Sequence, residues 1–277
     1  MMLRLPVKVF ALLAGLLAAG PAPAQDDVQG PPADNADHDL AKQLSNPVAS
    51  LISVPFQQNV DFGMGADGDG FKATLNLQPV VPISVGEDWN LILRTIVPIA
   101  WQDGVTAPDE SQFGLGDTLQ SFFFAPKAPT GGGIIWGAGP AFLYRTATDG
   151  ALGGGKWGAG PTIVVLRQAG KNTVGLLANH IWSVAGDDSR ADVSATFLQP
   201  FFSHTTARAT TFSLNTESSY DWLGEQWVVP VNATVTQLLK LGDQPVSIGG
   251  GIKYYAEKPA GGPDWGVRLV LTLLFPR

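Results

Sequence analysis

The stretch FKATLNLQPVVPIS, residues 71–84, alternates apolar and polar side chains along most of its length. Because successive side chains of a β-strand point to opposite sides, this pattern predicts an extended strand with one apolar and one polar face. The apolar face carries Phe71, Ala73, Leu75, Leu77, Pro79, Val81 and Ile83, and the polar face carries Lys72, Thr74, Asn76, Gln78 and Ser84. The fold therefore depends on which of these two faces meets water.

Alternation of this kind recurs along the chain after residue 52, where the sequence has no helical periodicity. Turn residues separate about 12 segments of roughly 10 to 15 residues each, which is the pattern of an all-β protein. The segments begin near Ile52, Phe71, Trp89, Phe113, Ile134, Lys156, Thr173, Val193, Thr210, Gln226, Gln244 and Asp264. An even number of antiparallel strands is typical of bacterial outer-membrane barrels.

The polar faces decide between a soluble β-sandwich and a membrane barrel. A sandwich hides its apolar faces in a core and shows polar faces to water, whereas a membrane barrel turns its apolar faces to lipid. Charged residues make up only 15% of the chain, and the polar faces carry mainly Gly, Ser, Thr, Asn and Gln. We therefore predict a transmembrane antiparallel β-barrel of about 12 strands over residues 52–277.

The sequence before residue 52 predicts a leader in two parts. Residues 1–24 place Arg4 and Lys8 before a short apolar run and end in Ala-Pro-Ala, which is the pattern of a secretory signal peptide. Residues 25–51 are first polar and then carry Leu40, Leu44, Val48 and Leu51 at helical spacing. We expect a periplasmic leader with a short helix that is a candidate plug or brace for the barrel.

The pentapeptide WGAGP occurs twice, beginning at Trp136 and at Trp157. Each copy begins a strand, so each Trp is expected on the outer surface near a membrane interface, where aromatic girdles form. Trp89 and Trp265 complete the girdle candidates. The glycines of both copies are expected to face the lumen, either as part of a cavity wall or to relieve packing at bulges.

Loop composition predicts an orientation. With both termini in the periplasm, the periplasmic turns are mostly short, and the opposite side carries acidic loops with Asp67, Asp69, Asp103, Asp109 and Glu110.

Seven prolines argue against the predicted barrel, because a closed sheet has no free edge for a residue without an N–H. They are Pro79, Pro82, Pro98, Pro140, Pro161, Pro200 and Pro230, and each requires a bulge, a rim or a local break.

Five charged residues on the predicted polar faces are the lumen-lining candidates. They are Asp61, Arg94, Glu217, Lys253 and Arg268. Opposite charges in a narrow pore can select a permeant by field and size, or they can neutralise each other as filling. The sequence favours a filled lumen with a narrow passage, because 12 strands lie between the filled 8-stranded and the open 16-stranded barrels.

The residue inventory argues against several other functions. The chain has no cysteine and a net charge of −7, which excludes thiol chemistry and disfavours nucleic acid as a partner. Outer-membrane lipid hydrolases place His and Ser two residues apart, and none of His38, His180 and His204 has that neighbour. Asp187, Asp188 and Asp192 could bind calcium, but a solvated acidic loop is favoured. No enzyme activity, cofactor or metal is expected.

Several stretches resemble one family of bacterial outer-membrane proteins. They include NPVASLISVPFQ (residues 46–57), LNLQPVVPISVGEDWNLILRTIVPI (75–99), GLGDTLQSFFFAPK (114–127), LANHIWSVAGDDSRADVSATFLQPF (177–201), LNTESSYDW (214–222) and LTLLFPR (271–277). The family is labelled meta-pathway of phenol degradation or transporter, and some members carry the label neuromedin U. The resemblance implies a Gram-negative outer-membrane barrel with a transport role, and it implies no catalytic residue. One departure is that Phe275 is followed by Pro276 and Arg277, whereas barrel proteins commonly end in an aromatic residue.

These observations predict a porin-like channel that passes small solutes by diffusion, with hydrophobic or aromatic solutes as candidates. The expected partners are outer-membrane lipid, the permeant and, during biogenesis, the barrel assembly machinery. A closed barrel with a structural or partner-docking role is the alternative, and an outer-membrane hydrolase is the third reading.

Overall fold

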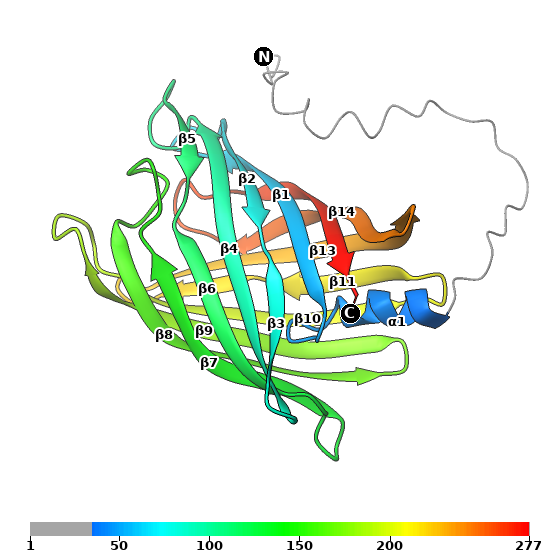
Figure 1. Cartoon of the computed structure of the whole chain (residues 1–277). Coiled ribbons are helices and arrows are strands. Elements are labelled where there is room, and N and C mark those ends of the chain that lie inside the picture. Colours follow the sequence, from blue (N-terminus) through cyan, green and yellow to red (C-terminus); the bar gives the residue numbers. More distant parts are fainter. Residues whose placement is uncertain (1–34, 277) are drawn as a thin grey trace, which may run out of the picture. The chain divides into compact units, whose positions relative to one another are not determined.

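The computed structural model describes residues 35–276 of the chain, which contain one helix and fifteen strand segments (Figure 1). The helix is α1 (Asn35–Gln43). The strands are β1 (Ile52–Met64), β2 (Gly70–Leu77), β3 (Val80–Val85), β4 (Trp89–Asp103), β5 (Ser111–Leu115), β6 (Thr118–Pro126), β7 (Ile134–Tyr144), β8 (Lys156–Ala169), β9 (Asn172–Gly186), β10 (Ser194–Thr205), β11 (Thr210–Thr216), β12 (Ser218–Asp221), β13 (Gln226–Leu241), β14 (Gln244–Glu257) and β15 (Trp265–Phe275). The predicted signal peptide, residues 1–24, and residues 25–34 of the predicted leader lie outside the described residues.

All strand pairs are antiparallel, and the sheet closes on itself. From β10 the order runs through β11 and β12, which lie end to end, and then through β13, β14, β15, β1, β2, β4, β6, β7 and β8 to β9. The sheet closes because β9 pairs with β10. Three barrel strands are interrupted, between β2 and β3, β5 and β6, and β11 and β12. The fifteen segments therefore form twelve barrel strands, which confirms the predicted fold, and the observed starts lie within two residues of the predicted ones.

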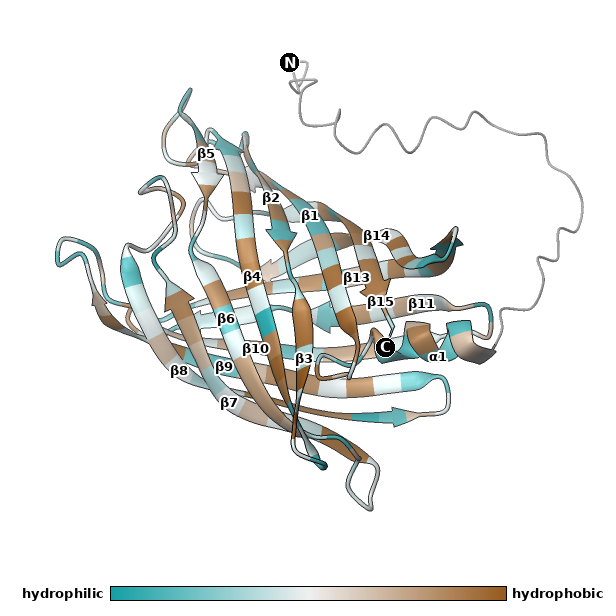
Figure 2. Ribbon diagram, viewed as in Figure 1, coloured by the Kyte–Doolittle hydropathy of each residue, from teal (hydrophilic) through white to brown (hydrophobic). Residues whose placement is uncertain are grey.

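The two faces of the strands are the reverse of those in a soluble protein. On β15 the side chains of Trp265 and Leu269 are 51% and 38% exposed, whereas Arg268 between them is 4% exposed. Apolar and polar residues alternate along the strands (Figure 2). Large apolar side chains cover the outer surface and polar ones are enclosed, so the outer surface suits lipid and not water. We place this barrel in the bacterial outer membrane.

The prolines lie where the hydrogen-bonded ladder is already interrupted. Pro200 and Pro230 flank the break at Glu217 from the two neighbouring strands, and Pro98 accepts a hydrogen bond from Gly116 N at the break between β5 and β6. Pro79 lies in the break between β2 and β3. Pro82 lies on the part of β3 that extends past the start of β1, so it has no partner on β1. A missing N–H at these positions costs no ladder bond.

The remaining two prolines belong to the WGAGP repeats. Pro140 and Pro161 are partners across β7 and β8. On the far side of each, the pairing with β6 or β9 is interrupted over the same residues. The repeated pentapeptide thus places two prolines opposite each other, each next to a local gap in the sheet.

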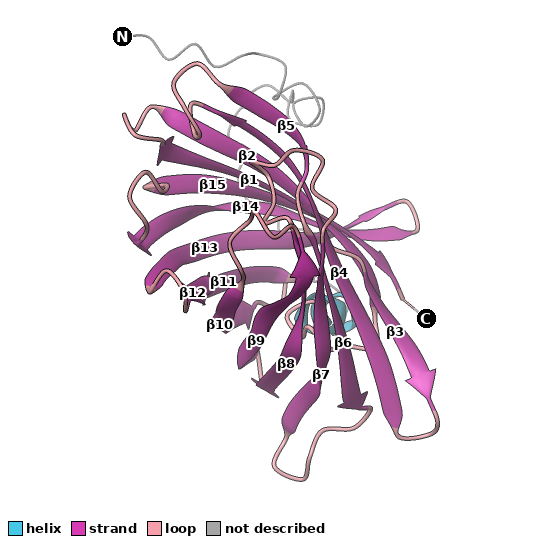
Figure 3. Ribbon diagram, turned by 90° about the vertical axis from the view of Figure 1, so that its left-hand side faces the viewer, coloured by secondary structure: helices cyan, strands magenta, loops and turns pink. Residues whose placement is uncertain are grey.

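Helix α1 begins the described part of the leader. Asp37 lies in its first turn and Lys42 in its last, where each charge is favoured by the helix dipole. After the helix, Val48 N donates a 3.0 Å hydrogen bond to the side chain of Asn46, and the chain then enters β1. In Figure 3, which is turned by 90° from Figure 1, α1 is the cyan helix seen between the strands. No helix among residues 35–276 is long and apolar enough to cross a membrane.

Candidate functional site

The enclosed face of the barrel has two unlike sectors. We define the polar sector by residues Asn59, Asp61, Lys72, Arg94, Ser203, Thr211, Ser213, Glu217, Thr234, Thr236, Lys253 and Arg268. We define the apolar sector by Ile92, Phe123, Ala125, Val164, Leu166 and Leu177. We also name the two ends of the barrel: the α1 end carries the helix and short turns, and the loop end carries the longer loops. The predicted orientation of these ends in the membrane stays a prediction.

The ion pair between Arg268 and Glu217 is the strongest contact of the polar sector. Glu217 accepts two hydrogen bonds from the Arg268 guanidinium, at 2.9 and 2.7 Å, and Arg268 Nε donates to Asn59 Oδ1 at 2.7 Å. The pair crosses β13 and β14, and Gly251, the β14 partner of Arg268, places no side chain beneath it. The break at Glu217 therefore lets a carboxylate reach over two strands to a buried cation.

A second ion pair joins Lys253 and Asp61 across β15. Lys253 Nζ lies 2.8 Å from Asp61 Oδ1, and it donates a 2.9 Å hydrogen bond to the hydroxyl of Tyr255. Gly266 is the β15 partner of both charged residues, and a Cβ at Gly266 would overlap the Asp61 carboxylate. Glycine at this position therefore gives the two side chains room to meet.

Two further cations share this face of the sheet. Lys72 is the strand partner of Asp61 and of Gln102, so its side chain lies on the same face as theirs. Arg94 donates a 3.1 Å hydrogen bond to Gln78 at the break between β2 and β3. The sequence analysis named Arg94 but left out Lys72, although the alternation of residues 71–84 had already placed Lys72 on the polar face.

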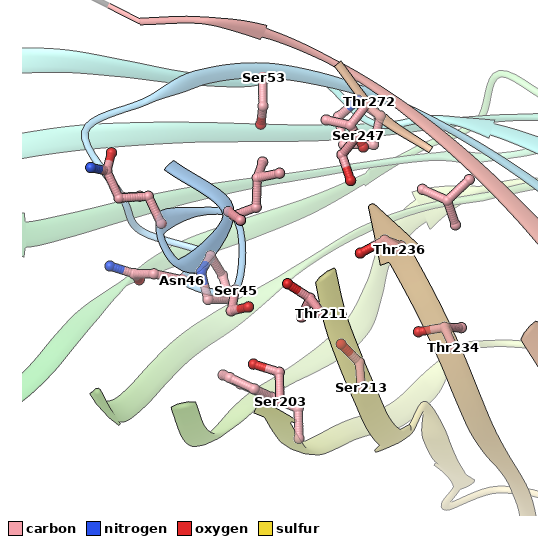
Figure 4. Close-up of a pocket in the computed structure, with 18 of the residues that line it drawn as sticks. Ser45, Asn46, Ser53, Ser203, Thr211, Ser213, Thr234, Thr236, Ser247 and Thr272 are labelled. Atoms are coloured by element: carbon pink, nitrogen blue, oxygen red, sulfur yellow. The ribbon is translucent and has the colours of Figure 1, made fainter. Parts of the chain in front are cut away.

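A cavity of about 290 Å³ lies between the Arg268–Glu217 pair and the leader segment. Arg94, Glu217 and Arg268 line it together with hydroxyl side chains from six strands, and Figure 4 shows Ser203, Thr211, Ser213, Thr234 and Thr236 along one wall. Residues of the leader between Ala41 and Ala49 form the opposite wall. The Ser203 hydroxyl is buried and has no hydrogen-bond partner among the described residues. The cavity can therefore hold a small polar group.

Val48 of the leader covers the apolar sector. It is 5% exposed and packs in one cluster with the six residues of that sector. Gly137, from the first WGAGP, faces the same cluster, since a Cβ there would lie 3.2 Å from side-chain atoms of Val48, Phe123 and Ala125. This glycine therefore faces inward, as the repeat predicted, and it makes room for the leader.

Polar contacts hold the leader at the α1 end. Asp37 Oδ1 lies 2.9 Å from Lys240 Nζ, and His38 Nδ1 lies 3.0 Å from the carbonyl oxygen of Thr206. The carbonyl of Lys42 accepts a 2.9 Å hydrogen bond from Gln168. Ala41, Ala49 and Leu51 also pack against Leu238 and Leu274 of the barrel wall. The described part of the leader is thus fixed to the wall by charge, hydrogen bonds and apolar packing.

The four candidate girdle tryptophans each contact another aromatic residue. Trp89 and Trp136 pack edge to face at 5.9 Å between ring centroids, at the α1 end. Trp157 packs against Tyr144 at 5.9 Å, and Trp265 stacks on Phe62 at 4.7 Å, both at the loop end. Trp136 and Trp157 therefore mark opposite ends of neighbouring strands, as expected from their antiparallel course.

The acidic residues of the loop 187–193 are held by basic and hydroxyl groups. Hydrogen bonds from Ser189 lower the pKa of Asp187, and the hydrogen bond from Lys156 lowers the pKa of Asp192, with Lys156 Nζ at 3.0 Å from its carboxylate. Within residues 35–276 no group of three or more acidic or histidine side chains is arranged to hold a metal ion.

Histidine 180 has hydroxyl neighbours that the sequence analysis did not foresee. Its Nδ1 lies 2.7 Å from Thr196 Oγ1, and its Nε2 lies 3.4 Å from Ser194 Oγ, both across a strand pair. The test for His and Ser two residues apart within one strand could not find this contact. A distance of 3.4 Å exceeds the roughly 2.6 to 3.2 Å over which a base takes a proton from its nucleophile. The distance to Ser194 is therefore longer than this range, whereas that to Thr196 lies within it.

Fold and surface together define the class of protein: a closed 12-stranded outer-membrane β-barrel. Its structure is similar to the COG4313 outer membrane channel from Pseudomonas putida F1, with a TM-score of 0.63 and 14% identity over 81% of this chain and 94% of that chain. It also matches OprB from Pseudomonas putida, with a TM-score of 0.36 and 8% identity over 88% and 97% of the two chains. No family model and no curated protein matches the sequence. At 14% identity, the likeness to the COG4313 channel shows a shared fold.

Proposed function

We propose that this barrel is a channel through which small solutes cross the outer membrane by diffusion. The observation that supports this function most directly is the 290 Å³ cavity inside the closed barrel, lined by hydroxyls and by Arg94, Glu217 and Arg268. A barrel used only as a scaffold would gain stability by filling this space with packed side chains. A polar lining next to fixed charges instead suits water and small polar solutes.

The apolar sector supports the finer proposal that hydrophobic or aromatic solutes are among the permeants. Its side chains, such as Ile92 and Phe123, are fully buried under Val48. If the leader moved, these side chains would present an apolar surface inside the lumen. The resemblance to proteins labelled for phenol degradation agrees with this class of solute, which stays a proposal.

The leader is the proposed plug. Residues between Ala41 and Ala49 form one wall of the cavity, and Val48 covers the apolar sector. Its polar contacts through Asp37, His38 and Lys42 lie at the α1 end. Displacing this segment would join the cavity to the solvent at that end and would widen the passage.

Conductance in planar bilayers tests the channel, and removal of residues 25–51 tests the plug. We expect the reconstituted full chain to carry small currents and the shortened chain to carry larger currents and faster solute entry in liposome swelling. A folded full chain without ion current or solute uptake would favour the alternative, a closed structural or docking barrel. Unchanged conductance after the deletion would reject the plug but not the channel.

The charge of the lumen offers a third test of the channel. Arg268→Glu places a negative charge beside Glu217, so we expect the ion preference of the current to shift toward cations. The reversal potential in a salt gradient measures this preference. An unchanged reversal potential would show that permeating ions do not pass Arg268.

A further inference from the structure

The charged side chains of the polar sector are not balanced. Lys72, Arg94, Lys253 and Arg268 are four cations, whereas Asp61 and Glu217 are two carboxylates. Each carboxylate forms one ion pair, Asp61 with Lys253 at 2.8 Å and Glu217 with Arg268 at 2.7 Å. Among the described residues, Lys72 and Arg94 form no ion pair of their own. The lumen therefore has an excess of positive charge in a chain whose net charge is −7.

The two unmatched cations lie at different depths in the lumen. Lys72 lies in the row of strand partners that runs through Gln102, Lys72, Asp61, Gly266, Lys253 and Asn232. Arg94 lies nearer the α1 end, at the cavity, where its described hydrogen bond to Gln78 uses one of five N–H donors. An anion that entered from the loop end would meet Lys72 first and Arg94 next.

The lining around Arg94 fits a partly dehydrated anion. Ser203, Ser213 and Thr234 are successive strand partners on β10, β11 and β13, and all three line the cavity. Hydroxyl groups donate hydrogen bonds to anions and replace part of the lost hydration. The buried and unpartnered Ser203 hydroxyl is one donor that is free among the described residues. The cavity that Arg94 lines thus offers both charge and hydrogen bonds.

The acidic groups at the loop end do not cancel this excess. Asp67, Asp69 and Asp109 are exposed in the loops, where salt screens charges over about 8 Å at physiological ionic strength. Asp117, on the wall near the loop 145–155, accepts hydrogen bonds from the backbone N–H groups of Ala147 and Gly154. Enclosed charges are screened less, so Lys72 and Arg94 dominate the field in the lumen.

We propose that the polar sector is a path selective for small anions, and that two cations set this selectivity: Lys72 nearer the loop end and Arg94 at the cavity. The inference rests on the proposed channel function and names the class of ion that it favours. Lys253 and Arg268 mainly neutralise the two carboxylates and shape the wall. The apolar sector takes no part in this path.

Reversal potentials of the full chain in a potassium chloride gradient test the proposal. We expect chloride to permeate better than potassium. Arg94→Gln and Lys72→Gln should each move the permeability ratio toward unity, by up to about fivefold, since a unit charge at about 4 Å in water contributes about 1 kcal/mol. Arg208→Gln and Lys171→Gln make the same charge changes at exposed turn positions and serve as matched controls. They should leave the ratio unchanged.

The outcomes separate this inference from the function on which it rests. A current that prefers potassium or has no preference would overturn the anion path and leave the channel intact. Equal shifts in the two lumen variants and the two controls would show that the net charge of the protein acts, and not the charge of the lumen, which also overturns it. A folded chain with no current would overturn the channel and the inference with it. Heat-dependent mobility on gels verifies that every variant folds.

Discussion

The polar and apolar sectors of the lumen are built by strands with the same alternation but enclose opposite chemistry. In the polar sector, Asn59, Arg268, Gly251 and Thr234 follow one another as strand partners, and small or charged side chains leave a cavity. In the apolar sector, Phe123 and Val164 are fully buried, and Val48 of the leader closes over them. The difference shows that one part of the barrel wall can be lined by polar side chains around a cavity while another part is a packed apolar core covered by the leader.

The largest effect on the free energy of unfolding is expected from a substitution in the apolar sector. Phe123 is 0% exposed, so Phe123→Ala should leave a cavity and lower the free energy of unfolding by about 3 to 5 kcal/mol. Urea unfolding in lipid vesicles, followed by tryptophan fluorescence, measures this change. Phe113→Ala is the comparison variant: Phe113 is 73% exposed on the outer side of the sheet, so its truncation leaves no internal cavity and the expected loss is smaller. An equal loss in both variants would show that this sector is not a core.

Breaking the polar sector at Glu217 should have the next largest effect. Glu217→Ala leaves the buried Arg268 guanidinium without its carboxylate and should lower the free energy of unfolding by about 3 kcal/mol. Adding Arg268→Met removes the stranded charge and should restore most of the loss. Glu225→Ala, in an exposed turn, serves as the control in the same urea titration. A single variant as stable as the parent would show that the ion pair contributes no stability.

A substitution at Val48, where the leader packs on the apolar sector, is expected to have a smaller effect. Val48→Ala removes apolar surface from the leader and should weaken its docking by about 1.5 kcal/mol, at about 0.8 kcal/mol for each buried carbon. Faster proteolysis of residues 35–51 and a larger mean conductance are the expected results. Val174→Ala, on the outer surface, removes the same atoms and should change neither. Protease protection equal to that of the parent would show that Val48 does not stabilise the docked leader.

The smallest effect concerns the loop end and its response to pH. The pKa of Asp187 is lowered by hydrogen bonds from Ser189, and that of Asp192 by the hydrogen bond from Lys156. Since both pKa values are depressed in the folded loop, these contacts are present above the ordinary carboxyl pKa of about 4 and are lost as pH falls further. Hydrogen exchange of residues 187–193, corrected for the intrinsic rate, should increase below about pH 4. Unchanged protection at pH 3 would contradict this assignment.

Alternation in the sequence predicted the barrel well because the signal is local. The period of two in residues 71–84 and 265–275 indicates a strand in each case, and the polarity of the second face indicates a lumen. Asp61, Arg94, Glu217, Lys253 and Arg268 could be placed on the enclosed face for the same reason. Their pairing could not, because it depends on the register of strands that are far apart in sequence.

The features that sequence reasoning missed are all non-local. Pro200 and Pro230 make sense only when the break at Glu217 lies between them, and this requires the register of three strands. The apolar sector was missed because Val164 and Ile163 are equally apolar, although one faces the lumen and the other is 47% exposed. Residue type alone could not separate a side chain that meets lipid from one that meets Val48.

The central claim is that the polar sector is wet, the apolar sector is dry and the outer face meets lipid. The chain has no cysteine, so Thr234→Cys, Val164→Cys and Ile163→Cys each introduce one thiol, on the polar sector, the apolar sector and the outer face. A small, negatively charged thiol reagent applied to the folded protein in lipid vesicles measures which of them is in water. We predict that Thr234→Cys reacts and that the other two react only after unfolding in urea; reaction of Val164→Cys or Ile163→Cys at the rate of Thr234→Cys would contradict the account.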